Sequence, residues 1–193
     1  MECDDSPTSV THKQYCVFSI YFIYFMRYDS KQYIIFHVIG TGREVVINML
    51  ILRRAVESDC GRLFYWANDR ETRKNSFHTE EISYGEHTAW FQRKLQEPAC
   101  QIFILLCDGR EAGQIRLEQE GDTAKISYVI APEYRNRGLG SEILRLVEPF
   151  AEGKALLGRV KRENRASGKC FEKNGYEKTE QEEWVEYIKM TGK

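Results

Sequence analysis

The sequence contains no pair of cysteines at the C-x-x-C spacing that zinc ribbons and redox motifs use. Its six cysteines are scattered between Cys3 and Cys170, and none of the four histidines lies at a metal-ligand spacing from them. A chain of 193 residues without a convincing secretion signal has little need of a disulfide framework. These observations argue against a zinc site and predict reduced thiols in the cytoplasm.

Charge of one sign and long apolar stretches are also missing. The 28 basic and 29 acidic residues give a formal charge of -1, so composition indicates no general affinity for nucleic acid or for an anionic membrane. Residues 15–26 are almost all apolar or aromatic, but this run is shorter than the roughly 20 residues that a membrane-spanning helix needs. We therefore expect no membrane partner, and any basic site must be local.

The chain divides by composition near residue 49. Residues 1–48 combine a polar start with two aromatic-rich runs, whereas Met49 opens a segment that reads as a first strand and then a helix start. We predict one domain over residues 49–193. The extension 1–48 is interpreted either as translated upstream sequence or as an added element packed on the domain surface. A peptide from before Met49 in natively expressed protein, detected by mass spectrometry, would exclude the first interpretation.

Hydrophobic periodicity predicts a mixed α/β order within residues 49–193. The predicted strands are 50–54, 101–107, 111–118, 124–131, 156–161 and 176–190, the last interrupted, and the predicted helices are 59–69, 84–95, 139–151 and 165–174. Asp-Gly and Gly-Asp pairs at 108–109 and 121–122 indicate hairpins between the three central strands. The expected fold class is α/β (α+β), with an antiparallel meander followed by a crossover.

Several helix boundaries have specific signals. Ser83 and Glu86 form a capping box, and Ser58 and Asn164 are candidate N-caps. Pro149 predicts a kink or an early end of the helix over 139–151. Gly175 suits the C-terminal turn of the helix over 165–174.

The most informative stretch is residues 131–141, Ala-Pro-Glu-Tyr-Arg-Asn-Arg-Gly-Leu-Gly-Ser, between a strand and a helix. Two glycines allow close approach of a ligand, and the free N–H groups at a helix start favour an anion. A glycine-rich turn that only reverses the chain is the alternative. The spacing differs from both the G-x-G-x-x-G and the G-K-[ST] phosphate motifs.

The R-x-x-G-x-G order of Arg135, Gly138 and Gly140 resembles the acetyl-CoA signature of the GNAT superfamily of N-acetyltransferases. That resemblance implies the GNAT fold, a mixed and mostly antiparallel central sheet flanked by helices, with acetyl-CoA as co-substrate and no metal. It implies a set of cofactor-binding residues in the strand, the turn and the following helix: Val129, Ile130, Ala131, Arg135, Asn136, Arg137, Gly138, Leu139, Gly140, Ser141, Asn164 and Lys169. A plain helix cap at Asn164 and a solvated Lys169 are the alternatives.

The catalytic groups are less clear. Phe171 stands where many members of the superfamily carry a tyrosine that protonates the departing thiolate, which excludes that role for this residue. His78 is a candidate base, because an ordinary histidine pKa of about 6.5 lets it accept an amine proton at neutral pH. A surface histidine without a catalytic role is the alternative.

The segment W-x-N-D-x-x-x-R-x-x-S-F, followed by E-x-I-x-x-x-E-H-x-x-W-F, is similar to acetyltransferases of bacterial surface-polysaccharide biosynthesis. These act on nucleotide-linked 4-amino-4,6-dideoxy sugars, as in the pseudaminic acid pathway. The resemblance implies an amino-sugar nucleotide as acceptor, contacted by Asn68, Arg73, Ser76, Phe77 and His78. An acetyltransferase of protein N-termini, such as those of ribosomal proteins, and a non-catalytic acyl-CoA-binding module are the alternatives.

Overall fold

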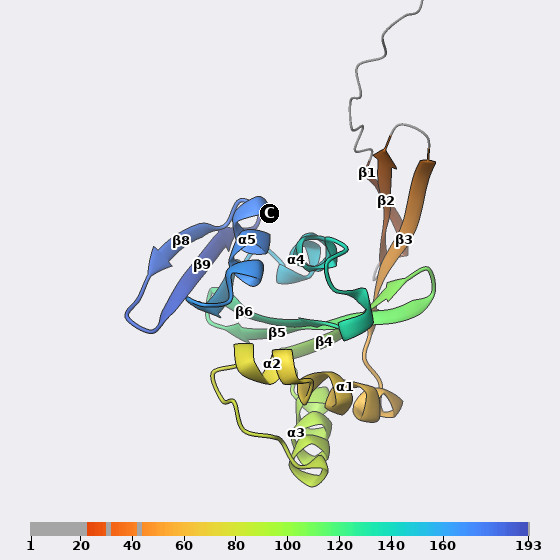
Figure 1. The fold of residues 1–193 in the computed structure, drawn as a ribbon. Helices are drawn as coiled ribbons and strands as arrows, with labels where there is room; N and C mark the ends of the chain where they lie inside the picture. The colour runs from red at the N-terminus through yellow and green to blue at the C-terminus, as the bar shows by residue number, and fades with distance from the viewer. Residues whose placement is uncertain (1–22, 30–31, 42–43, 193) are drawn as a thin grey trace, which may run out of the picture.

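The computed structural model describes residues 23–29, 32–41 and 44–192, with side chains from residue 48 onward (Figure 1). The strands are β1 (Ile23–Asp29), β2 (Gln32–Thr41), β3 (Glu44–Arg54), β4 (Cys100–Cys107), β5 (Arg110–Glu120), β6 (Thr123–Ile130), β7 (Ala155–Lys161), β8 (Glu177–Glu180) and β9 (Trp184–Met190). The α-helices are α1 (Cys60–Ala67), α2 (Arg70–Asn75), α3 (Tyr84–Gln96), α4 (Leu139–Val147) and α5 (Arg165–Lys173). Three short 3-10 turns are η1 (Glu57–Asp59), η2 (Pro132–Tyr134) and η3 (Glu148–Ala151).

All these strands form one sheet in the order β1-β2-β3-β4-β5-β6-β7-β9-β8. Every neighbouring pair is antiparallel except β6 and β7, which are parallel and are joined through α4. Helices α1, α2 and α3 lie on one face, and α4 and α5 lie on the other (Figure 1). The predicted mixed, mostly antiparallel sheet flanked by helices is confirmed.

The parallel strands β6 and β7 separate part of the way along, and this separation leaves a gap between them. Residues 123–126 of β6 pair with residues 155–158 of β7, and the register ends there. Beyond it, β6 continues to Ile130 paired only with β5, and β7 continues to Lys161 paired only with β9. The backbone N–H and C=O groups that face this gap are therefore available to an extended ligand.

Strand alternation divides the core in two. Even-numbered residues of β6 such as Ile126 pack with α4 and α5, in the larger cluster, which includes Phe103 and Leu144. The opposite face packs against α1 and α3 through a smaller cluster around Trp66 and Phe91. Odd-numbered residues of β6 and β7 beside the gap therefore lie on the α1–α3 face.

Several local predictions are confirmed. The Ser83–Glu86 capping box is present, and Asn164 caps α5. Helix α4 ends at Val147, and Pro149 lies in the following 3-10 turn, as its missing N–H requires. Gly175 has a φ of 75°, in the left-handed region that a helix C-terminal turn uses.

Other boundaries differ from the sequence prediction. Ser58 does not cap α1, because η1 precedes the helix and Asp59 takes the N-cap position. Helix α2 was not predicted, since its six residues carry no apolar stripe; Asp69 opens it by accepting a hydrogen bond from the Thr72 N–H. The predicted strand 176–190 is divided into β8 and β9 by a turn over residues 181–183.

Strand β3 crosses the predicted domain start at Met49, because it begins at Glu44 and pairs with β2 along residues 44–51. The division into 1–48 and 49–193 stays a prediction. The extension's polar start and its first aromatic run up to residue 22 lie outside the described residues.

Candidate functional site

The turn over residues 131–141, which we call the anion turn, leads from β6 into α4. Asn136 and Gly138 both adopt left-handed conformations, with φ of 60° and 76°. In the described chain the backbone N–H groups of residues 136–140 donate no hydrogen bond, and that of Ser141 bonds back to the Gly138 carbonyl at 3.0 Å. Left-handed residues alternating with ordinary ones turn successive N–H groups toward one point. The anion turn is thus a preformed concavity of donors at the start of α4.

Side chains and backbone groups within the anion turn anchor this concavity to the rest of the fold. Leu139 is buried in the larger core, and the carbonyl of Ser141 accepts a hydrogen bond from Asn174 Nδ2 at 3.1 Å. Arg137 places its guanidinium over the Tyr134 ring, 5.1 Å from the ring centroid. The donors are therefore held by contacts with the core and with neighbouring elements.

Helices α4 and α5 meet closely beside the anion turn. A β-carbon on Gly140 would lie 2.8 Å from the Cys170 Sγ atom and 3.5 Å from the Tyr128 hydroxyl. Tyr128 shares a hydrogen bond of 3.0 Å with Ser167. Burial, and then the nearby Cys170, raise the pKa of Tyr128 above its usual value, so its hydroxyl stays protonated at neutral pH.

Val129, Ile130 and Ala131 lie where β6 borders the gap. Their backbone is fixed from the other side by β5: the Ala131 N–H donates to the Ala112 carbonyl at 2.9 Å. A β-carbon on Gly113 would lie 2.5 Å from the Val129 carbonyl oxygen, so a glycine is required for this close approach.

Asn164 lies at the start of α5 and Lys169 lies within this helix. Asn164 Oδ1 accepts a hydrogen bond from the Ser167 N–H at 3.2 Å, which is its helix-capping role. Lys169 lines a cavity of about 330 Å³ between α5 and the strands β7, β8 and β9, together with Arg165 and Glu172. The α5 residues that meet α4 and Tyr128 are instead Ser167 and Cys170.

The side chain of Arg135 is directed at α2. Its guanidinium makes an ion pair with Asp69, a second with Glu71 at 2.9 Å, and a hydrogen bond to Thr72 Oγ1 at 3.1 Å. Its Nε donates to the Ile130 carbonyl at 3.3 Å. The first arginine of the R-x-x-G-x-G order is therefore occupied by protein groups.

Residues 68–83, which we call the connecting segment, join α1 to α3 and include α2. Arg73 organises this segment by donating to the carbonyls of Ala67 (2.6 Å), His78 (3.2 Å) and Glu80 (3.4 Å), and to Ser76 Oγ (3.0 Å). Burial lowers the pKa of Arg73, and Glu80 opposes that shift. The guanidinium is fully engaged in holding the loop.

Asn68 and Ser76 are used in the same way. The Asn68 amide donates to the Ile82 carbonyl at 2.8 Å and accepts from the Ile82 N–H at 2.9 Å. Ser76 Oγ donates to the Thr72 carbonyl at 2.7 Å. The structure therefore brings Asn68, Arg73 and Ser76 together as a scaffold of the connecting segment.

Phe77 and His78 differ from these three. Phe77 is half exposed and packs edge-on against Trp184 of β9, with ring centroids 6.2 Å apart. The His78 ring is exposed and has no hydrogen-bond partner in the described chain, and only its carbonyl is used. The structure places both residues on the same side of the sheet as α2.

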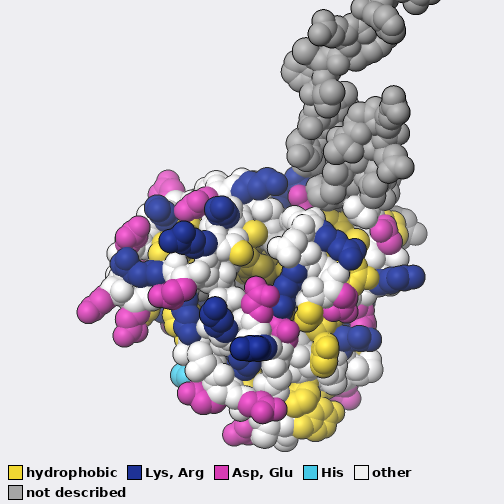
Figure 2. All heavy atoms as spheres, in the orientation of Figure 1, with side chains coloured by type: hydrophobic (Ala, Val, Ile, Leu, Met, Phe, Trp, Pro, Cys, Tyr) yellow, Lys and Arg dark blue, Asp and Glu magenta, His cyan; other side chains and the backbone are white. Residues whose placement is uncertain are grey.

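Several cationic side chains lie on this face, and over α2 Lys and Arg side chains stand among Asp and Glu side chains (Figure 2). Arg70 and Lys74 are exposed on α2, and Lys161 Nζ donates to the Lys74 carbonyl at 3.2 Å from the end of β7. In the part of the chain that the structure describes, these three cations have no ion-pair partner. Arg159 pairs with Glu186 at 3.1 Å and lies over Trp184. Sequence reasoning missed this surface, although alternation along β7 places 159 and 161 on one face.

Phe171 is almost completely buried at the position of the family tyrosine. Its ring stacks on Tyr187, with centroids 5.1 Å apart, and packs against Gly158, where a β-carbon would lie only 2.3 Å from the ring. The ring is a packing element of α5 against β7 and β9.

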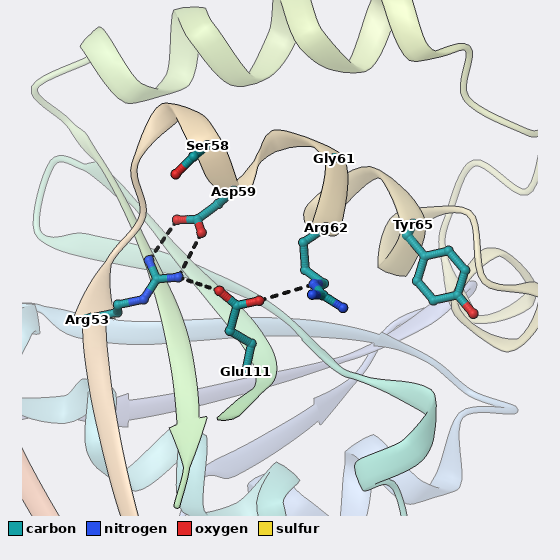
Figure 3. A pocket seen from close by; sticks show the side chains of 7 residues that line it. All are labelled: Arg53, Ser58, Asp59, Gly61, Arg62, Tyr65 and Glu111. Carbon is teal, nitrogen blue, oxygen red and sulfur yellow. Dashed lines mark hydrogen bonds and ion pairs between the residues drawn. The ribbon is translucent and has the colours of Figure 1, made fainter. Parts of the chain in front are cut away.

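A second cavity, of about 480 Å³, lies between β3, α1 and the start of β5, and Figure 3 shows two arginines converging on Glu111 there. Arg53 pairs with Asp59 at 2.7 Å and with Glu111 at 2.7 Å, and Arg62 pairs with Glu111 at 3.1 Å. Burial works against the charge of Asp59, but the hydrogen bonds from Arg53 and from the Val56 N–H keep its pKa below the usual value. The charges are mutually satisfied, so this network ties α1 to the sheet.

Among the described residues, no group of three histidine, cysteine or acidic side chains is arranged to hold a metal ion. The described cysteines, Cys60, Cys100, Cys107 and Cys170, are free thiols. Within the same residues no helix is long and apolar enough to cross a bilayer.

Comparison with known proteins gives a family match. The family model described as "Acetyltransferase (GNAT) domain" matches residues 49–177. No curated protein sequence is significantly similar to the chain.

Solved structures share the fold at low sequence identity. The spermidine N-acetyltransferase of Vibrio cholerae, in complex with CoA and spermine, has a TM-score of 0.67 at 16% identity, covering 74% of this chain and 95% of its own. A ribosomal L7/L12 α-N-protein acetyltransferase in complex with coenzyme A has a TM-score of 0.63 at 16% identity, with coverages of 73% and 93%. AAC(6')-Ib in complex with ribostamycin and coenzyme A has a TM-score of 0.65 at 16% identity, with coverages of 73% and 93%.

Proposed function

Because the chain belongs to the acetyltransferase (GNAT) family, we propose that it transfers the acetyl group of acetyl-CoA to the amine of an anionic acceptor, an amino-sugar nucleotide. When bound, the donor supplies an activated thioester, and no metal is needed for transfer to a neutral amine. The chain's own residues have three tasks: to hold the donor, to orient the amine, and to take up its proton.

The anion turn supports donor binding. The N–H groups of residues 136–140, which donate to no other described residue, fit a diphosphate, because each can donate to an oxygen without breaking an internal hydrogen bond. The open edge of β6 at 127–130 fits an arm that carries amide groups, since an extended chain can pair with a free strand edge. Both features are backbone features and need no side-chain rearrangement.

One observation carries the choice of acceptor: Lys161 at the end of β7, and Arg70 and Lys74 on the neighbouring helix α2, have no ion-pair partner among the described residues. A polycationic acceptor, such as the spermine of the Vibrio cholerae complex, would be repelled by these positive charges. The phosphates of a nucleotide sugar would be attracted by them. The half-exposed Phe77 and its neighbour Trp184 offer an aromatic surface for a base or a sugar ring.

His78 is our candidate for the group that takes the amine proton. Its ring is exposed on the connecting segment and carries no competing hydrogen bond among the described residues. Replacement His78→Gln should lower kcat with the sugar nucleotide while leaving CoA affinity unchanged, because only removal of the amine proton loses its acceptor. An unchanged kcat would assign the proton to bulk water.

Thiol release from acetyl-CoA tests the proposal directly. The protein is offered a UDP-linked 4-amino-4,6-dideoxy sugar, spermidine, an aminoglycoside, and peptides with free N-termini. Of these acceptors we expect only the sugar nucleotide to be acetylated. With that acceptor, the variant Lys161→Glu should lose about tenfold or more in kcat/KM. The matched control Arg110→Glu, an exposed residue at the start of β5, should leave turnover unchanged.

Other outcomes have definite meanings. Turnover with peptides alone would identify an N-terminal acetyltransferase and overturn the acceptor assignment. Binding of CoA without turnover on any acceptor would identify a non-catalytic module.

A further inference from the structure

The anion turn and the connecting segment are joined by one side chain. Arg135 reaches from the anion turn to three residues in the first turn of α2, namely Asp69, Glu71 and Thr72. The same side chain is also held at the end of β6, because its Nε donates to the Ile130 carbonyl. The guanidinium therefore bridges the anion turn, where we propose that the donor binds, and the connecting segment, where we propose that the acceptor binds.

Asp69 has two functions in this bridge. It caps α2 by accepting from the Thr72 N–H at 3.0 Å, and it pairs with Arg135 through the same carboxylate. Burial opposes its charge, but the bonds from Arg135 and Thr72 outweigh that effect and hold its pKa below the usual value. The ion pair is mostly shielded from solvent, since Arg135 and Asp69 are 21% and 19% exposed.

The contacts continue beyond α2. Arg73, in the same helix, fixes the carbonyls of His78 and Glu80, and the Lys74 carbonyl receives the bond from Lys161 of β7. A rigid helix thus connects Arg135 to the loop that carries Phe77 and His78. Movement of α2 away from the anion turn would move that loop as well.

We propose that Arg135 is a positioning residue that holds α2 and the connecting segment against the anion turn, and is not a ligand of the donor's diphosphate. Because three of the four terminal N–H groups of the guanidinium already bond to Asp69, Glu71 and Thr72, a phosphate held by both terminal nitrogens would require some of these contacts to break. Donor binding falls to the N–H groups of 136–140 and to Arg137. This inference rests on the proposed donor and is independent of the acceptor.

A pair of variants distinguishes the two roles, since Arg135→Gln and Arg137→Gln remove the same charge from the same turn. We expect Arg135→Gln to speed amide hydrogen exchange in residues 70–82 by about tenfold or more, with the Kd for CoA changed less than about twofold. Arg137→Gln should instead raise the Kd for CoA and leave amide hydrogen exchange in residues 70–82 nearly unchanged. If an acceptor is known, Arg135→Gln should raise its KM more than that of acetyl-CoA.

The double variant Asp69→Asn with Glu71→Gln removes the partners while keeping a residue that can cap α2. It should reproduce the exchange pattern of Arg135→Gln, and combining all three changes should add little to it. A tenfold rise in the CoA Kd of Arg135→Gln with unchanged exchange in 70–82 would overturn the proposal. Exchange and CoA binding need no acceptor, so failure of the sugar-nucleotide assay would leave this test intact.

Discussion

The anion turn and the connecting segment are both rich in polar groups, but they use them in opposite ways. In the anion turn the N–H groups of residues 136–140 have no partner among the described residues, and the fold around them is fixed by buried residues such as Leu139. In the connecting segment the side chains of Asn68, Arg73 and Ser76 form hydrogen bonds within the chain itself. Backbone donors at a helix start can bind water or an anion without breaking a bond, whereas a loop side chain often only replaces missing backbone bonds.

The largest effect should come from breaking the scaffold of the connecting segment. Arg73→Gln removes hydrogen bonds to three carbonyls and to Ser76. The bonds to Ala67 and Ser76 are partly buried, so we expect a loss of about 3 kcal/mol in the free energy of unfolding. Urea denaturation measures it. Arg70→Gln on the same helix removes no hydrogen bond or ion pair to another described residue, so the change in the free energy of unfolding should stay within about 0.5 kcal/mol. Equal losses would mean that helix propensity, and not the carbonyl bonds, stabilises the segment.

A second change tests whether the anion turn depends on close packing. Gly140→Ala puts a β-carbon 2.8 Å from Cys170 Sγ, which should cost about 2 kcal/mol and weaken CoA binding. Adding Cys170→Ala removes the clashing atom and should restore part of both. Calorimetry with CoA and thermal unfolding give the two values.

Gly61→Ala is the matched glycine control for Gly140→Ala. An added β-carbon on Gly61 in α1 meets nothing within 4 Å, so the substitution should stabilise the helix by about 0.5–1 kcal/mol. Failure of Cys170→Ala to restore binding would place the constraint elsewhere than in the α4–α5 contact.

The smallest effect concerns pH and should appear on the α1–α3 side alone. His87 of α3 is buried against Phe91 and Phe64, and burial lowers its pKa, although a hydrogen bond to the Cys60 backbone works in the opposite direction. The unfolded chain then binds more protons, so stability falls as pH drops through the unfolded value near 6.5 toward the folded pKa.

Thermal unfolding between pH 7.5 and 5.5 measures this dependence, and His87→Phe should flatten it. Over the same range any change of the CoA Kd with pH should be the same in both proteins, because His87, the buried histidine among the described residues, lies on the α1–α3 side. A Kd that follows the stability would contradict the separation of the two regions.

The anion turn and the elements on either side of it were predicted well from the sequence. The two glycines, the strand before them and the helix after them were recognisable because backbone geometry restricts which residues can stand there. The side-chain direction of Arg135 could not be read, since its partners Asp69 and Glu71 are more than 60 residues away in the chain.

The surroundings of the connecting segment were harder to predict for a physical reason. Polar residues such as Arg73 have the same composition signal whether they face a ligand or their own loop, and only the fold decides between the two. Lys161 carried a usable signal, because alternation with the buried Val160 places it on the α1–α3 face, but its significance depends on α2 lying opposite.

The last strand of the sheet has a consequence for behaviour at high concentration. Among the described strands β8 is hydrogen-bonded only to β9, and its four residues, Glu-Lys-Thr-Glu, are all exposed. A short edge with alternating charge is a poor template for another strand, because any approaching backbone would have to desolvate these side chains. The protein thereby presents, at this end of its sheet, an edge that resists aggregation.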